Sequence, residues 1–244
     1  MNKKRGFTLA EVLVTLGIIG VVAAVTLPAL RSDTEKLQYE QGLKITVGNL
    51  NEGFARMLGD YETDSLSDTK LFNEILSNSK SETKYVDANK ELGKYFNIDR
   101  SYAKDAEGEA ATISEQQFYA LNGNDCSSNI NDSSSIIYLS NGAKLHLMFK
   151  ETLSSRNTSK YDIRLHVDVN GDKGPNTFGK DIYTFFVTDD GKVVARGSKT
   201  SKDLGIENYL WSDKTMCGGD QPRGTGWYCA GRVVEEGYKI TYKF

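Results

Sequence analysis

A loop in the second half of the chain is rich in oxygen donors, with the sequence Asp168-Val169-Asn170-Gly171-Asp172-Lys173-Gly174-Pro175-Asn176 followed by Asp181. Oxygen-bearing side chains at its first, third and fifth positions suit a hard cation such as calcium, and Asn176 or Asp181 would complete the shell. The loop departs from an EF-hand, because Lys173 occupies the glycine position and Gly179 stands where a bidentate glutamate belongs. A solvated Asn-Gly turn whose Asp and Asn side chains bond their own backbone is the alternative interpretation. The calcium interpretation assigns four ligands, Asp168, Asn170, Asp172 and Asp181.

The chain has only two histidines, His146 and His166. Both fall on the polar side of predicted strands, away from the Leu and Val side chains, and we expect them to be solvated. A cross-strand zinc pair is the alternative, but it has no third spaced ligand. The sequence contains no Gly-x-Ser-x-Gly string, phosphate-binding loop or metalloprotease string. We therefore predict a protein that is not an enzyme and needs no cofactor.

A single carboxylate, Glu11, interrupts a nearly apolar run of 24 residues from Phe7 to Leu30. Lys3, Lys4, Arg5 and then a glycine precede this run. At roughly 1.5 Å per residue, a helix of this length spans about 36 Å, enough to cross a bilayer with some tilt. Because a carboxylate inside such a helix is costly, Glu11 indicates a functional site.

This N-terminus resembles that of the type IV pilin and type II secretion pseudopilin family, through the basic leader, Pro28 and the string Gly6-Phe7-Thr8-Leu9-Ala10-Glu11-Val12-Leu13. The resemblance implies that a prepilin peptidase cuts between Gly6 and Phe7 and methylates the new terminal amine. It implies that Glu11 neutralises the amine of a neighbouring subunit, a pairing that makes both charges tolerable in hydrocarbon. Pro28 lies where the family's helix kinks. Related pseudopilins also carry a calcium-stabilised loop near their sheet.

The N-terminal segment has two alternative interpretations. One is a secretory signal cut after Val22-Ala23-Ala24, and the other is a plain membrane anchor with its basic residues in the cytoplasm. Neither accounts for a glutamate that closely follows a Gly-Phe junction. We therefore predict a prepilin that spans the inner membrane once, with its N-terminus cytoplasmic, and later joins a filament in the periplasm or at the cell surface. The implied partners are prepilin peptidase, like and related subunits, an inner-membrane assembly platform and, before assembly, membrane lipid.

The three cysteines, Cys126, Cys217 and Cys229, would all face an oxidising compartment if the N-terminus is cytoplasmic. Three cysteines allow three alternative pairs. Cys217 and Cys229 enclose a glycine-rich segment that is expected to have little stable structure of its own. A disulfide that closes a loop of this size contributes about 3 kcal/mol to folding stability in the chain-entropy model. A C-terminal disulfide-bounded loop is also recurrent in pilins. We favour a Cys217–Cys229 disulfide, with Cys126 free or intermolecular.

Apolar residues at spacings of mostly three to four predict one long helix from about Thr8 to Gly59, whose second half packs on a sheet. Two helices broken at Pro28 are the alternative. Residues 60–135 lack strong strand signals, and short helices are expected at 67–76, 88–96 and 114–121.

From residue 135 onward, alternation with period two predicts strands. Asn141-Gly142 and Asp190-Gly191 each predict a hairpin turn. The expected strands are 136–139, 144–149, 161–169, 182–187, 193–195 and a closing strand at 238–244. The fold class is therefore α+β, a pilin-like long helix packed on an antiparallel sheet. The expected organisation is a leader (1–6), a transmembrane or filament-core helix (7–30), an amphipathic second half (31–59), a variable connecting region (60–135), and a sheet with the disulfide-bounded loop (136–244).

Charge and composition narrow the class of function. The net charge of the chain is −3, and loss of three basic leader residues leaves 27 basic against 33 acidic residues, or −6. An acidic domain gains nothing from counterion release, so nucleic acid is disfavoured as a partner. The chain is predicted to be a structural subunit of a pilus-like filament or secretion pseudopilus. The alternative is a filament-tip adhesin or substrate-binding minor pilin that uses residues 60–135 and the 217–229 loop.

Overall fold

The computed structural model describes residues 7–106, 116–131, 133–149, 162–213, 216–217 and 224–242. The chain divides into two units, Met1–Gln38 and Tyr39–Phe244, which we describe separately. Helix α1 (Leu9–Asp60) belongs to both units and is helical through position 28. The prediction of one continuous helix is therefore confirmed, and the interpretation as two helices broken at Pro28 is wrong.

In the first unit, the stretch Leu9–Thr26 is long and apolar enough to cross a membrane. Its large side chains are uncovered, with exposed fractions of 62% for Leu13, 63% for Ile19 and 73% for Val25. Exposed apolar area of this extent is unfavourable in water, which indicates that a membrane or other helices cover it.

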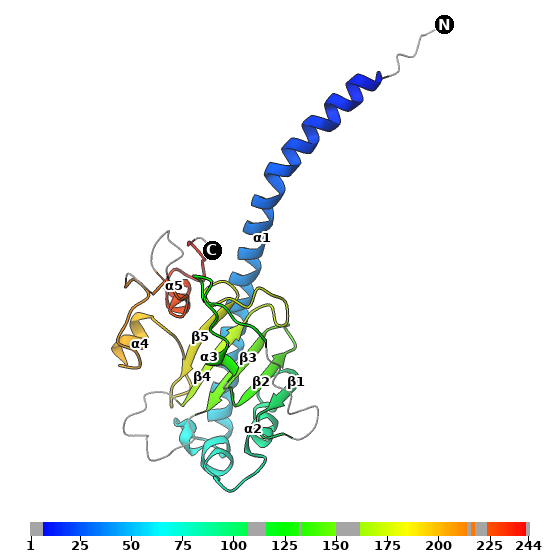
Figure 1. The fold of residues 1–244 in the computed structure, drawn as a ribbon. Coiled ribbons are helices and arrows are strands. Elements are labelled where there is room, and N and C mark those ends of the chain that lie inside the picture. The colour runs from blue at the N-terminus through cyan, green and yellow to red at the C-terminus, as the bar shows by residue number, and fades with distance from the viewer. Residues whose placement is uncertain are drawn as a thin grey trace. The chain divides into compact units, whose positions relative to one another are not determined.

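The second unit is built on a six-stranded sheet in which every neighbouring pair of strands is antiparallel, in the order β1-β2-β3-β4-β5-β6. The strands are β1 (Ile98–Ala103), β2 (Ser135–Leu139), β3 (Lys144–Phe149), β4 (Ile163–Asp168), β5 (Ile182–Val187) and β6 (Val193–Ala195). The second half of α1 runs along one face of this sheet (Figure 1). The structure thus has the predicted α+β, pilin-like fold.

The face of the sheet toward α1 holds the main hydrophobic core. One stripe of α1 contributes residues that recur every three to four positions, namely Tyr39, Leu43, Val47, Leu50, Phe54 and Met57. Alternate strand residues meet it, among them Ile137, Leu145, Leu147, Leu165, Val167, Tyr183 and Phe185. The alternation in the sequence therefore predicted this face correctly.

The connecting region contains a strand that the sequence did not predict. Strand β1 pairs with β2 from Ala103 opposite Ser135 to Ile98 opposite Leu139, with a shift of register between Ile98 and Arg100. It is an edge strand in which only Ala103 is fully buried. Backbone pairing rather than side-chain burial holds it, so it leaves no period-two pattern in the sequence.

The short helices of this region differ from those expected. The predicted helix at 67–76 is divided into η1 (Leu66–Asp68) and a π-helix, η2 (Leu71–Leu76), and the predicted helix at 88–96 is α2 (Lys84–Leu92). The predicted helix at 114–121 is wrong for 116–121, the part that the structure describes, because Tyr119 instead forms bridges with Asp125 and Thr177. Three further short helices are α3 (Ser128–Asn131), α4 (Lys199–Asp203) and α5 (Cys229–Glu235).

The predicted closing strand is absent from residues 238–242, and residues 243–244 lie outside the described residues. A side chain of α1 holds this tail instead. The Ile240 N–H donates to Glu40 Oε1 at 2.7 Å, and Lys239 Nζ lies 3.2 Å from Glu40 Oε2. Ile240 and Tyr242 are buried. The alternating pattern of residues 238–244 therefore predicted the burial of these two side chains correctly but wrongly predicted that residues 238–242 pair as a strand.

Candidate functional site

The N-terminal helix begins with a reciprocal arrangement between Thr8 and Glu11. The Thr8 N–H and hydroxyl both donate to Glu11 Oε2 at 2.8 Å, and the Glu11 N–H donates to the Thr8 hydroxyl at 3.3 Å. This is a capping box, which satisfies backbone donors that the first helical turn leaves without partners. Glu11 therefore has a role within its own chain, and the Thr-x-x-Glu string before an apolar run is the signal that would have predicted it.

The other N-terminal residues singled out from the sequence are only partly described. Gly6 lies outside the described residues, and with it the Gly6–Phe7 bond. Phe7 is 91% exposed at the start of the described chain. Glu11 is the only acidic or basic residue of the stretch Leu9–Thr26.

Two of the predicted calcium ligands, Asp168 and Asp181, are fully buried at the loop that follows β4. Asp168 Oδ1 accepts the Asn170 N–H at 3.2 Å, whereas Oδ2 has no hydrogen-bond partner. Both oxygens of Asp181 accept backbone N–H groups, from Thr177 at 2.6 Å and from Asn176 at 2.9 Å. Burial, and then the nearby Asp181 carboxylate, raise the pKa of Asp168 well above its usual range.

Asp172, the third predicted carboxylate ligand, has a different set of partners. It accepts hydrogen bonds from the Tyr138 hydroxyl at 2.6 Å and from Arg100 Nη2 at 3.0 Å, and Lys144 Nζ lies 3.2 Å away. Gln116 Nε2 also donates to it at 3.3 Å. Burial raises the pKa of Asp172, but the hydrogen bonds from Tyr138 and Lys144 outweigh this effect and lower it. Asp172 thus ties the loop to β1, β2 and β3.

The donor set of the loop fits a hard cation in part. In the described part of the chain, no three His, Cys, Asp or Glu side chains come together as a metal site. Three buried oxygens of the loop nevertheless lack hydrogen-bond partners, Asp168 Oδ2, Asn170 Oδ1 and Asn176 Oδ1. Carboxylate and amide oxygens of this kind are calcium ligands, and a buried unpaired carboxylate is costly without a counter-charge. The nearby Lys144 ammonium supplies some of that counter-charge, because it partly offsets the rise in the pKa of Asp168 that burial and Asp181 cause.

The two histidines are a cross-strand pair, the arrangement that the alternative interpretation supposed, since His146 of β3 lies opposite His166 of β4. The expectation that they are solvated is wrong, because their exposed fractions are 2% and 1%. Phe118 packs edge-on against the His146 ring and Phe178 against the His166 ring, each with centroids 5.3 Å apart. Phe118 and Phe178 belong to a second apolar cluster on the face of the sheet away from α1, made of Phe118, Ala120, Cys126, Ile130, Phe178 and Ile182.

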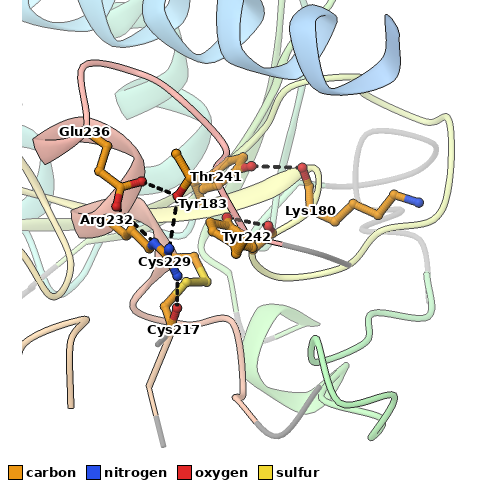
Figure 2. Close-up of a disulfide and its surroundings, with 9 residues drawn as sticks. Lys180, Tyr183, Cys217, Cys229, Arg232, Glu236, Thr241 and Tyr242 are labelled. Carbon is orange, nitrogen blue, oxygen red and sulfur yellow. Dashed lines mark hydrogen bonds and ion pairs between the residues drawn. A yellow bond between two sulfur atoms is a disulfide. The ribbon is translucent and has the colours of Figure 1, made fainter. Parts of the chain in front are cut away.

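Cys217 and Cys229 form the predicted disulfide, and Cys126 is a buried cysteine that takes no part in it. Figure 2 shows that Arg232 organises the surroundings of this bridge. Its Nη1 donates to the Cys217 carbonyl at 3.0 Å, its Nη2 to the Thr241 hydroxyl at 3.0 Å, and its Nε lies 3.2 Å from Glu236. Arg232 therefore joins the disulfide-bounded loop to α5 and to the C-terminal tail, a role that no sequence pattern indicated.

Comparison with protein-family models gives a match at the N-terminus. Residues 1–27 match the family model of the prokaryotic N-terminal methylation motif. No solved structure matches the chain. The chain thus carries the prepilin-type N-terminal motif followed by an α+β domain, and the motif supports its assignment as a subunit of the type IV pilin or pseudopilin type.

Proposed function

We propose that this chain is a structural subunit of a type IV pilus-like filament or a type II secretion pseudopilus. Prepilin peptidase would cut between Gly6 and Phe7 and methylate the Phe7 amine. The mature subunit would be held in the inner membrane by α1 until it is assembled through the same helix. The Glu11 carboxylate would pair with the Phe7 amine of a neighbouring subunit, and repetition of this head-to-tail contact would produce a helical filament.

The observation that carries this proposal is the position of Glu11. It is the one ionisable residue of the exposed apolar stretch Leu9–Thr26, four residues beyond the proposed new terminus Phe7, within a matched methylation motif. Only one of its oxygens takes part in the capping box. The other oxygen is left to accept an amine from another chain, and pairing lowers the cost of both charges in hydrocarbon.

The first experiment is the intact mass and N-terminal sequence of the protein from its native cell. A chain that begins at methylated Phe7 supports prepilin processing. A chain that begins near Val25 identifies an exported protein with a secretory signal, and the assembly role of Glu11 is then wrong.

A pair of substitutions separates the pairing role of Glu11 from its capping role. Glu11→Gln keeps the capping-box hydrogen bonds but removes the charge, whereas Thr8→Val removes the Thr8 hydroxyl and its two hydrogen bonds with Glu11 but keeps the charge. An unpaired charge inside a membrane costs about 2.5–3.5 kcal/mol, so we expect Glu11→Gln to reduce filament incorporation roughly 100-fold. Thr8→Val should assemble and insert normally. The reverse pattern would show that Glu11 acts by capping alone.

We also propose a calcium ion at the loop after β4, held by Asp168, Asn170 and Asp181, with Asn176 completing the oxygen set. The three unpartnered buried oxygens favour it. Bound calcium would supply the positive charge that the buried Asp168 carboxylate lacks, and so would stabilise the folded loop.

The test is thermal unfolding of the full chain with calcium, with magnesium and with a chelator. A ligand at 100 times its Kd adds about 2.7 kcal/mol to the stability, so calcium should raise the melting temperature and magnesium should not. Asp168→Asn should abolish the calcium effect. Asp172→Asn is the matched control, because it alters the same loop and should leave the calcium effect in place. Equal melting curves under all three conditions would favour a loop held by its own hydrogen bonds.

A further inference from the structure

The second unit contains a polar pocket of about 230 Å³ that lies away from the two sites described above. It is formed by three stretches that are distant in the sequence: the last turns of α1, the residues that follow α2, and the turn between β2 and β3. Its volume is below the range of about 300–1,000 Å³ that is usual for drug-sized ligands. The pocket therefore has room for a ligand of about one ring.

The floor of the pocket is apolar and fixed. Phe96 and Leu139 line it and are exposed by only 8% and 6%. The Phe96 ring packs edge-on against Phe54 and lies directly on Gly53, where an added Cβ would be 2.1 Å from the ring. Only glycine at position 53 permits the Phe96 ring to lie this close to α1, so the glycine fixes the position of the ring at the floor of the pocket.

The rim of the pocket contains polar groups that are hydrogen-bonded within the protein and side-chain amides that are not. Arg56 Nη2 donates to the Tyr95 carbonyl at 2.5 Å, and Arg56 Nε lies 4.0 Å from the Glu52 carboxylate. The Ser140 N–H and hydroxyl both donate to the Asn97 carbonyl, at 2.9 and 3.1 Å, which fixes the backbone at this point. Within the described residues, the side-chain amides of Asn49 and Asn97 form no hydrogen bond. Each of them offers both donors and an acceptor.

We propose that this pocket binds one neutral sugar ring, with its C–H face on Phe96 and its hydroxyls bonded to Asn49 and Asn97. Sugar hydroxyls both donate and accept, as carboxamides do, and the opposite charges of Glu52 and Arg56 favour a neutral ligand. An extended peptide fits less well, because such peptides usually add to an open strand edge. Here the pocket lies at a hairpin turn, and β2 and β3 are paired on both sides. The proposal does not depend on filament assembly.

The test is saturation-transfer NMR on the full chain in a zwitterionic detergent that contains no sugar, with glucose, galactose, mannose and N-acetylglucosamine as probes. We expect at least one sugar to bind in the millimolar range. Asn49→Ala and Asn97→Ala should each weaken binding about three- to tenfold, and the double variant should abolish it. Asn73→Ala, which removes an exposed amide on η2 outside the pocket, is the matched control and should bind normally.

Two results would overturn the proposal. One is the absence of transfer from all four sugars, including the case in which neutral tripeptides give a signal instead. The other is transfer that survives in the Asn49→Ala/Asn97→Ala double variant, because the sugar would then bind elsewhere. Melting curves of the variants should match that of the parent chain, since both side chains are exposed.

Discussion

The two faces of the sheet bury different sets of side chains, because the face toward α1 is apolar whereas the other face combines polar with apolar side chains. Along β3, Leu145 and Leu147 point into the core with α1, whereas Lys144 and His146 point to the other side. All four are buried, with exposed fractions of 2% or less. Residues 116–131, which we call the covering segment, lie over the second face, with α3 on the side of the sheet opposite α1 (Figure 1).

This difference shows that the two layers are held by different forces. The inner layer is stabilised by burial of apolar area and close packing. The outer layer depends on polar contacts, among them the Phe118 N–H to Ser127 Oγ at 2.9 Å and the Tyr119 N–H to the Asn176 carbonyl at 2.9 Å. Both ring nitrogens of His146 lack hydrogen-bond partners, which weakens that layer. We therefore expect the inner face to dominate the free energy of unfolding and the outer face to respond to pH and charge.

The largest effect should come from a cavity in the inner face. Leu165 of β4 is fully buried in the core with α1, and Leu165→Ala should lower the free energy of unfolding by about 2–5 kcal/mol. Urea unfolding of the full chain, followed by tryptophan fluorescence, measures this. Leu204→Ala is the control, because Leu204 is 44% exposed and should change stability by less than about 0.5 kcal/mol. Equal losses in both variants would contradict a core centred on this face.

The sequence predicted the inner layer well because each of its elements carries its own periodicity. The stripe of α1 and the alternation of β2 to β5 each report which side is buried. The outer layer was missed because its cover leaves no such pattern. The covering segment has few apolar residues that reach the sheet, such as Phe118 and Ile130, and backbone bridges at Tyr119 hold the part that precedes the short helix α3. The polar residues that alternate along the strands therefore predicted a solvent-exposed face, whereas in the fold the covering segment buries that face.

The same reasoning explains which parts of the candidate site were predicted. Glu11 stands out because a carboxylate within an apolar run is costly to bury in any fold. Cys217 and Cys229 stand out because they enclose a glycine-rich segment that needs a bridge to hold it. Asp172 was assigned with Asp168 from spacing alone, yet its partners Arg100 and Tyr138 come from strands far away in the sequence. The spacing of residues in the sequence identifies candidate metal-ligating oxygens, whereas the side chains that contact each oxygen depend on the register of the sheet.

Acid should destabilise the outer face selectively. Burial, and then the nearby Lys144 charge, lower the pKa of His146 well below its usual range, and burial lowers the pKa of His166 to about 3. Below pH 6.5 the unfolded chain binds protons that the folded chain does not, so stability is lost as the pH falls. Each histidine should remove about 1.4 kcal/mol per pH unit between pH 6 and 4. The raised pKa of Asp168 acts in the opposite direction, because its protonation favours the folded state as the pH falls.

A histidine variant isolates this effect from that of Asp168. His146→Phe keeps a ring against Phe118 but cannot take up a proton. The free energy of unfolding of the variant should fall less steeply with acid than that of the parent chain, by about 1.4 kcal/mol per pH unit. Trp227, which stacks on Phe178 in the outer layer, is a fluorescent reporter close to the pair. Parallel pH profiles would mean that His146 is already accessible to protons.

A smaller effect should follow from weakening the charge cluster at the edge of this face. Asp172→Asn leaves Lys144, whose side chain is 0% exposed, without the full charge of its carboxylate partner. Hydrogen bonds to charged groups contribute about 1.5–3 kcal/mol, but Asp172 is half-exposed, so we expect a loss near 1 kcal/mol. Urea unfolding at low and at high salt measures it. A loss that is the same at both salt concentrations would argue against a charge effect.

The smallest effect should come from removing the buried ammonium itself. Lys144→Met replaces the charge with an apolar chain of similar length, so the cost of burying the ammonium disappears together with its contacts to Gln116 and Asp172. These contributions nearly cancel, and we expect a change in unfolding free energy within about 1 kcal/mol of zero. The comparison with Asp172→Asn is decisive because both variants remove the ion pair between Lys144 and Asp172. If Lys144→Met costs several kcal/mol more than Asp172→Asn, the ammonium is itself a major support of the outer face, and the two faces are more alike in strength than their side chains indicate.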